Sequence, residues 1–105
     1  MNNFEICELK NLVDFKDGAI NANVLLKNDI RMALLIAIKE GQKVNEHISE
    51  TDALIYVLKG KIKFKVVQDD KSEYVLSKGE VMKFEPFVKH EVWGLEDSKI
   101  LVIRI

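Results

Sequence analysis

The only two histidines of this chain, His47 and His90, are its clearest candidates for chemistry. Imidazole binds transition metals and exchanges a proton near neutral pH, so the pair favours a metal site, a proton-transfer site or recognition of an acidic or hydroxyl-bearing small molecule. Near His47, position 49 is a serine and position 53 an alanine, and neither side chain is a good metal ligand. The histidines therefore locate a candidate site but define neither its reaction nor its ligand.

Strands are the elements that must position these side chains. Turn-forming residues recur at short intervals and divide the chain into strand-length segments, which is typical of an all-β domain. In residues 61–66, Ile62, Phe64 and Val66 alternate with three lysines, which predicts one buried face and one solvated face or a protected sheet edge. Residues 100–105 are rich in β-branched side chains and are interpreted as a closing strand.

Two continuous apolar runs, residues 31–38 and 51–58, fit a buried strand or a buried helix equally well by periodicity. Thr51 is a candidate cap for a helix that ends at Gly60. Their shortness favours strands. Such strands are apolar on both faces, so one face is expected to fill a barrel and the other to pack on a second sheet or another subunit, which predicts a homodimer.

Composition excludes several classes of protein. The chain has 105 residues, 16 basic and 17 acidic side chains and a net charge of −1, which fits one domain over 1–105 and argues against nucleic acid as a partner. The N-terminus lacks the pattern of a secretion signal, and the longest apolar run is too short to span a membrane. The single cysteine, Cys7, is interpreted as a packed apolar side chain, and a cytoplasmic location is expected.

The residues around the two histidines resemble the two motifs of the cupin superfamily. The first motif matches at 41–60, in the spacing from Gly41 to His47 and from Ala53 to Gly60, and the second matches at 79–94 through Gly79 and His90. In the second motif the family's Pro, Gly and Asn fall on Glu85, Phe87 and Gly94, and Pro86 is displaced by one position. A turn around Asp70 fits the variable loop between the motifs. The resemblance implies a jelly-roll β-barrel of two antiparallel sheets.

Cupins commonly hold a metal with three histidines and a glutamate. Carried over to this chain, His47 and His90 match two ligands, Ser49 replaces the second histidine and Ala53 replaces the glutamate. A hydroxyl is a poor ligand and alanine is none, so no cofactor is assigned beyond a weakly bound divalent transition metal. Glu85 is a candidate third ligand if its turn folds inward.

The same resemblance implies a barrel cavity floored by His47, Ser49 and His90. Strand alternation places Asn45 on that face as a further ligand-binding candidate and directs the neighbouring glutamates away. The expected function is binding of an unidentified small molecule without a full metal site. The alternatives are a metal-dependent enzyme of the isomerase, decarboxylase or dioxygenase type, using the two histidines, and a dimeric scaffold.

Three aromatic residues lie near the candidate site in the sequence: Tyr56, Phe87 and Trp93. Stacking on a ligand is one role open to them. Packing between the sheets or at a dimer contact is the favoured one, because aromatic side chains often anchor interfaces.

Overall fold

The computed structural model describes residues 4–68 and 72–105, with residues 46 and 47 described by their backbone alone. The turn predicted around Asp70 lies outside the described residues. Within these ranges the chain forms nine strands and one short 3₁₀ helix: η1 (Leu9–Asn11), β1 (Asn21–Asn28), β2 (Arg31–Ile38), β3 (Lys43–Ile48), β4 (Ala53–Lys59), β5 (Lys61–Val66), β6 (Glu73–Ser77), β7 (Val81–Phe84), β8 (Lys89–Gly94) and β9 (Ser98–Arg104). No helix in this part of the chain is long and apolar enough to cross a membrane.

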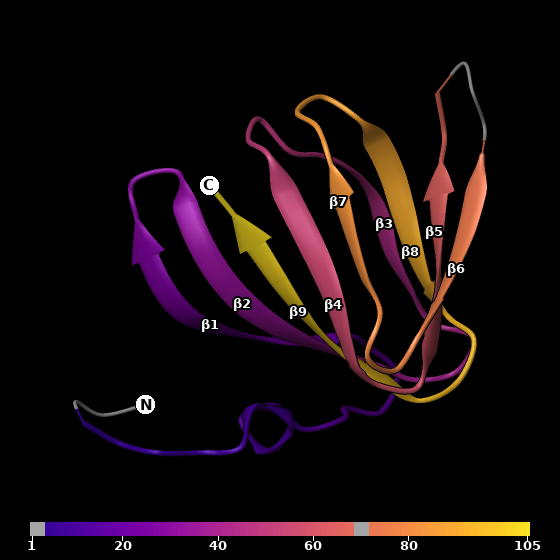
Figure 1. Cartoon of the computed structure of the whole chain (residues 1–105). Helices are drawn as coiled ribbons and strands as arrows, with labels where there is room; N and C mark the ends of the chain where they lie inside the picture. The colour runs from indigo at the N-terminus through magenta and orange to yellow at the C-terminus, as the bar shows by residue number, and fades with distance from the viewer. Residues whose placement is uncertain (1–3, 69–71) are drawn as a thin grey trace.

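The strands form two antiparallel sheets that meet at one end and open at the other (Figure 1). The five-stranded sheet has the order β1-β2-β9-β4-β7 and the four-stranded sheet has the order β3-β8-β5-β6. The predicted all-β architecture of two antiparallel sheets is therefore confirmed. Both ambiguous apolar runs are strands, β2 and β4, and each pairs with the closing strand β9.

The core lies between the sheets and follows the alternation of the sequence. On β5, Ile62 and Phe64 are buried while the three lysines face the other way. The lysine row does not protect a sheet edge, because β5 lies between β8 and β6. Lys63 instead lies 3.8 Å from Glu73 and 5.5 Å from the ring of Trp93 on the outer face. The inward-facing positions of β2, β4 and β9 complete this core: Leu34, Ile36, Ile38, Ala53, Ile55, Val57, Ile100 and Val102.

The outer face of the five-stranded sheet is covered in part by the chain's own N-terminal segment. Val13 is buried against Leu35 and Ala37 of β2, with Leu12, Phe15 and Leu101 packed around them. The side-chain amides of β1 hold this segment in place, since they donate hydrogen bonds of 2.7–2.9 Å to its backbone carbonyls. The outer apolar face of β2 and β9, which we expected a second sheet or another subunit to cover, is thus partly covered by the same chain. Cys7 lies before this segment and is exposed, so the prediction that it is packed is wrong.

The turn between β4 and β5 explains the last glycine of the first motif. Gly60 has a φ of +85°, which side chains rarely tolerate, and a Cβ there would lie 2.3 Å from Ser98 Oγ and 2.5 Å from the carbonyl oxygen of Asp97. Ser98 is fully buried and bonds both the amide and the carbonyl of Lys61. This contact fixes where β5 starts relative to β9.

Candidate functional site

The register between β3 and β8 brings the two histidine positions together. The backbone of His47 lies directly opposite that of His90, while Val44 lies opposite Val92. Three residues of β3 therefore span the length of two residues of β8, which is a β-bulge. The side chain of His47 lies outside the described part of the structure, so its role as a ligand stays a prediction.

His90 is buried inside an aromatic cluster, with 6% of its surface exposed. Its ring stacks on Phe64, with 4.7 Å between centroids and 16° between planes, and meets the edge of Phe84 at 4.8 Å. Nδ1 lies 2.8 Å from the carbonyl oxygen of Val88. A carbonyl only accepts hydrogen bonds, so Nδ1 carries a proton and donates it to Val88.

Ser49 is also buried, but its hydroxyl is used locally. Its Oγ lies 3.1 Å from both the carbonyl oxygen and the hydroxyl of Thr51, and it accepts a longer bond from the Thr51 amide. The carbonyl of Ser49 accepts a 2.7 Å hydrogen bond from the amide of Phe87. Ser49 therefore holds the loop after β3 against the turn before β8, which is a structural role at a motif position.

A small inner cavity of about 40 Å³ brings Ser49 and His90 together. Its lining also includes Arg104, the last residue of β9, among apolar side chains. Burial lowers the pKa of the Arg104 guanidinium. Arg104 lies opposite Ala53 in the β4–β9 register, at the motif position where the family has a glutamate. Arg104 therefore adds a basic residue to the lining of the cavity in which a metal is expected.

Sequence reasoning missed Arg104, although one signal could have found it. Ile100 and Val102 are buried in the core, and alternation along β9 places Arg104 on the same inward face. The alternation does not predict which residue of the neighbouring strand lies opposite Arg104. The pairing with Ala53 joins residues that are far apart in the sequence, so only the register of the sheet reveals it.

The other two predicted site residues lie elsewhere. Asn45 is exposed, and the prediction that it points into the barrel is wrong because the bulge in β3 interrupts the alternation on which it relied. Glu85 is exposed and lines a larger cavity at the open end of the barrel, not the inner cavity that contains His90. The structure therefore joins Ser49 and His90 and separates Asn45 and Glu85 from them.

The donor set does not fit a full cupin metal centre. Among the described side chains, no three from His, Cys, Asp and Glu lie close enough together to hold a metal. Ser49 bonds Thr51, Ala53 has no donor atom, and Arg104 adds positive charge to the same cavity. Imidazole and carboxylate supply most of the bonding to transition metals, and a nearby cation opposes binding.

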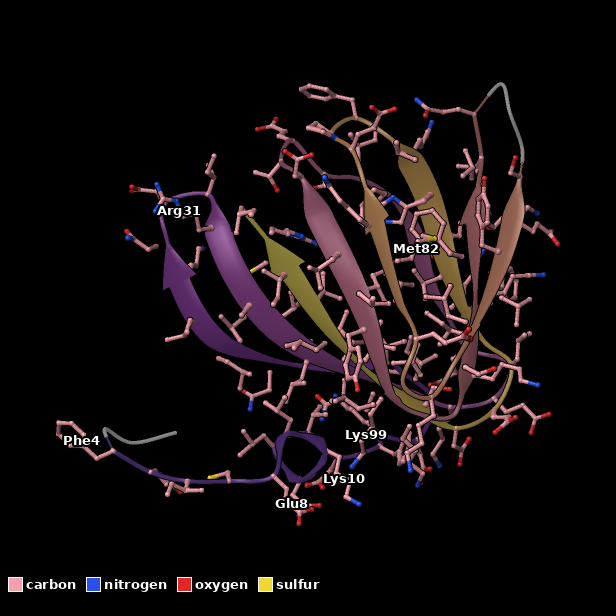
Figure 2. The ribbon with its side chains drawn as sticks, in the orientation of Figure 1. Phe4, Glu8, Lys10, Arg31, Met82 and Lys99 are labelled. Carbon is pink, nitrogen blue, oxygen red and sulfur yellow. The ribbon has the colours of Figure 1, made fainter. Side chains whose placement is uncertain are left out.

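A larger cavity, of about 840 Å³, lies at the open end of the barrel, and we call it the mouth cavity. Phe64 and Phe84 form its wall toward His90, and Phe84 also lines the inner cavity. Met82 lies between the two sheets (Figure 2). The remaining lining residues are Val66, Gln68, Tyr74, Lys83, Glu85 and Val88. Apolar walls with a few polar side chains are typical of small-molecule sites.

The three aromatic residues near the motifs do not pack between the sheets. Phe87 is 64% exposed and has a φ of +67°, so it occupies the left-handed conformation that the family's glycine adopts easily. Trp93 lies on the outer face of the four-stranded sheet, where Lys43 lies 5.0 Å from its ring and its Nε1 donates a hydrogen bond to Glu91. Tyr56 is half-buried and alternates with the inward-facing Ile55 and Val57, so it faces outward.

Comparison with known proteins identifies the fold and the family. The structure of a cupin superfamily protein from Desulfitobacterium hafniense matches with a TM-score of 0.89, at 19% identity, over 100% of this chain and 94% of that one. A protein of unknown function from Streptococcus pyogenes matches with a TM-score of 0.85, at 17% identity, over 99% of this chain and 90% of that one. At these identities the likeness shows the fold alone.

An RmlC-like cupin protein from Desulfovibrio desulfuricans also matches, with a TM-score of 0.80 at 24% identity, over 94% of this chain and 93% of that one. No curated protein sequence matches the chain. The cupin domain family model matches residues 34–104, which include both motifs, part of β2 and all of strands β3 to β9. The chain therefore belongs to the cupin domain family.

Proposed function

We propose that this cupin barrel binds a small organic molecule in its mouth cavity and does so without a full metal site. The observation that carries the proposal is the size and lining of that cavity, about 840 Å³ between apolar walls. Small-molecule sites usually have roughly 300–1,000 Å³ and a few polar groups that orient the ligand. Gln68, Tyr74, Lys83 and Glu85 supply such groups here.

The ligand that this arrangement favours carries an acidic or hydroxyl group. Arg104 and His90 line the inner cavity behind Phe84. A guanidinium pairs with carboxylates through two parallel hydrogen bonds, and imidazole donates to or accepts from hydroxyl groups. A ligand whose polar end reaches past Phe84 gains these contacts, while its apolar part stays against the aromatic wall.

Filling the mouth cavity tests the proposal. We expect at least one member of a set of small carboxylic acids and polyols to shift the amide resonances of Gln68 and Glu85 in solution. Met82→Trp places a bulky ring in the cavity and should abolish these shifts. Val81→Trp is the matched control, because Val81 precedes Met82 on β7 but is 58% exposed and does not line the cavity. Binding that survives Met82→Trp, or no binding by any compound, would refute the proposal.

Elemental analysis of protein purified without chelator tests the second part of the proposal. We expect no stoichiometric transition metal, because the described donor set includes one imidazole beside a guanidinium. A tightly bound metal that is lost in both His47→Ala and His90→Ala would overturn that expectation. It would also favour the metal-dependent enzyme over the binding protein.

A further inference from the structure

Phe87 holds a backbone conformation that its side chain disfavours. Its φ is +67°, and a bulky side chain at positive φ is strained. Phe87 lies in the turn that joins β7 to β8, directly after Pro86. Proline followed by a positive φ is the pattern of a type II turn, in which the residue after proline is normally glycine. Since Phe87 stands where the cupin motif has a glycine, the strain comes from the side chain and not from the turn itself.

The strained residue stands at the rim of the mouth cavity. Glu85 and Val88, two residues before it and one after it, both line that cavity. Phe87 itself does not line the cavity and is 64% exposed, although apolar side chains of both sheets form the walls beside it. A large aromatic ring is thus exposed to water next to an open apolar cavity.

Hydrogen bonds hold the turn from two sides. On one side, the Gln68 side chain accepts a 3.0 Å hydrogen bond from the amide of Lys89 and donates a 3.3 Å hydrogen bond to the carbonyl of Phe87. On the other side, the amide of Phe87 donates a 2.7 Å hydrogen bond to the carbonyl of Ser49. Turning over the peptide between Pro86 and Phe87 converts a type II turn into a type I turn. Of these three hydrogen bonds, that change breaks only the one to Ser49.

The two forms of the turn are close in free energy. Pro86 keeps its φ in both, because type I and type II turns take proline at the same position. The type I form gives Phe87 a negative φ, so the release of strain offsets the loss of the hydrogen bond to Ser49, and the two contributions are of the same order. Contacts that the ring makes in only one form therefore decide which form is populated.

We propose that Phe87 belongs to the ligand site, because the turn over residues 85–88 closes on an occupied mouth cavity and lays the Phe87 ring on the ligand. This inference rests on the proposed binding function of that cavity. Without a ligand, the ring gains few contacts by turning inward, and the hydrogen bond to Ser49 keeps the turn open. A bound molecule offers apolar surface to the ring, and closure then removes both surfaces from water. The site therefore retains organic acids with an apolar body in preference to polyols of the same size.

A single tryptophan at position 87 reports the closure. Phe87→Trp is combined with Trp93→Phe, so that the protein has one indole. Phe4→Trp with Trp93→Phe is the matched control, because Phe4 is fully exposed in a segment that stands apart from both sheets (Figure 2). Phenylacetate and the other acids and polyols of the binding test are added, and iodide quenching of the fluorescence is measured. We expect the acids that bind to protect the indole at position 87 from iodide and to leave the control unchanged.

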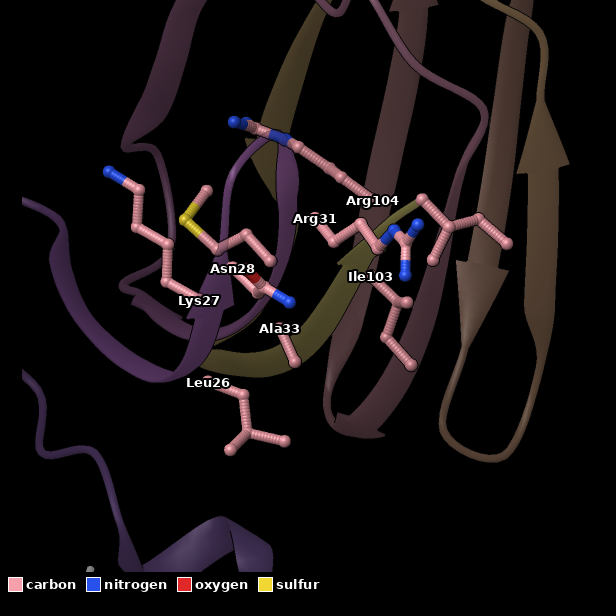
Figure 3. A pocket seen from close by; sticks show the side chains of 9 residues that line it. Leu26, Lys27, Asn28, Arg31, Ala33, Ile103 and Arg104 are labelled. Atoms are coloured by element: carbon pink, nitrogen blue, oxygen red, sulfur yellow. The ribbon is translucent and has the colours of Figure 1, made fainter.

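Amide resonances measured on the same samples separate this inference from the proposed function. Shifts at Gln68 and Glu85 with unchanged quenching at position 87 would overturn the closure and leave the binding function in place. No shift with any compound would overturn both. Leu26 and Ala33 line a separate open groove of about 330 Å³ at the end of β1 and β2 (Figure 3). Shifts at these two residues in place of Gln68 and Glu85 would also overturn both, because the ligand would then bind outside the barrel.

Two substitutions that remove the ring separate its contact with the ligand from the backbone strain. We expect Phe87→Ala and Phe87→Gly both to weaken binding of the acids roughly tenfold, because the ring contact is lost, while Phe4→Ala changes nothing. Glycine tolerates a positive φ and alanine does not, so only Phe87→Gly stabilises the open turn. Without ligand, the amide at position 87 should therefore exchange with solvent about fivefold more slowly in Phe87→Gly than in Phe87→Ala, after correction for intrinsic rates. Equal exchange, or unchanged binding by Phe87→Ala, would overturn the closure.

Discussion

Replacing Phe84 with alanine tests the wall that separates the mouth cavity from the inner cavity. Phe84 is 9% exposed, and its ring lies 5.0 Å from Phe64 and 4.8 Å from His90 between centroids. A buried phenylalanine removes roughly 150–250 Å² from water, and its truncation to alanine costs about 3–5 kcal/mol. We expect a loss of about 3 kcal/mol, at the lower end, because the open mouth cavity lets water fill the space.

The matched control is Phe87→Ala, the same substitution three residues further along the chain. Phe87 is 64% exposed, and alanine at its positive φ is as strained as phenylalanine, so we expect a cost of about 1 kcal/mol or less. Urea denaturation measures both variants, with an unchanged dependence on denaturant showing that the unfolded states are comparable. Equal costs, or a loss below about 1 kcal/mol for Phe84→Ala, would refute the packed wall.

A second readout follows from the position of Phe84 between the two cavities. Removing its ring joins the inner cavity to the mouth cavity, because Phe84 lines both. We therefore expect diethyl pyrocarbonate to modify His90 faster in Phe84→Ala than in the wild type, and at an unchanged rate in Phe87→Ala. Mass spectrometry of the peptide that contains His90 separates this reaction from that of His47. Equal rates in all three proteins would show that another group shields His90.

Three further outcomes are expected. Gly60→Ala should destabilise the fold by about 2 kcal/mol or more in urea denaturation, because of its positive φ and the close approach of Ser98; a neutral change would contradict the turn geometry. Ser98→Ala should cost about 1–2 kcal/mol in the same assay, since it removes buried hydrogen bonds. Hydrogen bonds from Lys43 and then Trp93 hold the pKa of the Glu91 carboxyl below its ordinary value. The stability that these hydrogen bonds add is present above the ordinary pKa of glutamate and is lost as the pH falls through the lowered pKa of Glu91. The loss of stability that Glu91→Gln causes in urea denaturation should therefore become smaller on acidification. A loss that becomes larger would refute this.

The fold could be predicted because burial leaves a local trace in a β-protein. The alternation over β5 gives its inward face directly, since Ile62 and Phe64 are buried. The apolar runs of β2 and β4 could be assigned as strands because they are too short for ordinary helices. The spacing from Gly41 to Gly60 reflects real constraints, among them the positive φ of Gly60.

The features that the sequence did not predict correctly have a common cause. Each depends on contacts between parts of the chain that are far apart in the sequence. The cover of the outer sheet by Val13 could not be predicted, because residues 12–15 form no strand and their partners lie on β2 and β9. The prediction for Asn45 relies on the alternation of a regular strand, and the bulge that interrupts it is defined only by the pairing with β8. The periodicity of the sequence predicts neither the cover by the N-terminal segment nor the bulge in β3.

The pairing of Ala53 with Arg104 bears most directly on what the barrel binds. A glutamate at position 53 would place a carboxylate in register with the guanidinium, on the inner side of the sheet. Alanine leaves the inner cavity with an arginine and an imidazole in its lining, and with no acidic residue among the described side chains that line it. Opposite charges attract strongly where water is excluded, which is why we propose an acidic ligand and not a cation for this cavity. The proposed lack of a full metal site and the proposed preference for an acidic ligand thus both follow from alanine at this motif position.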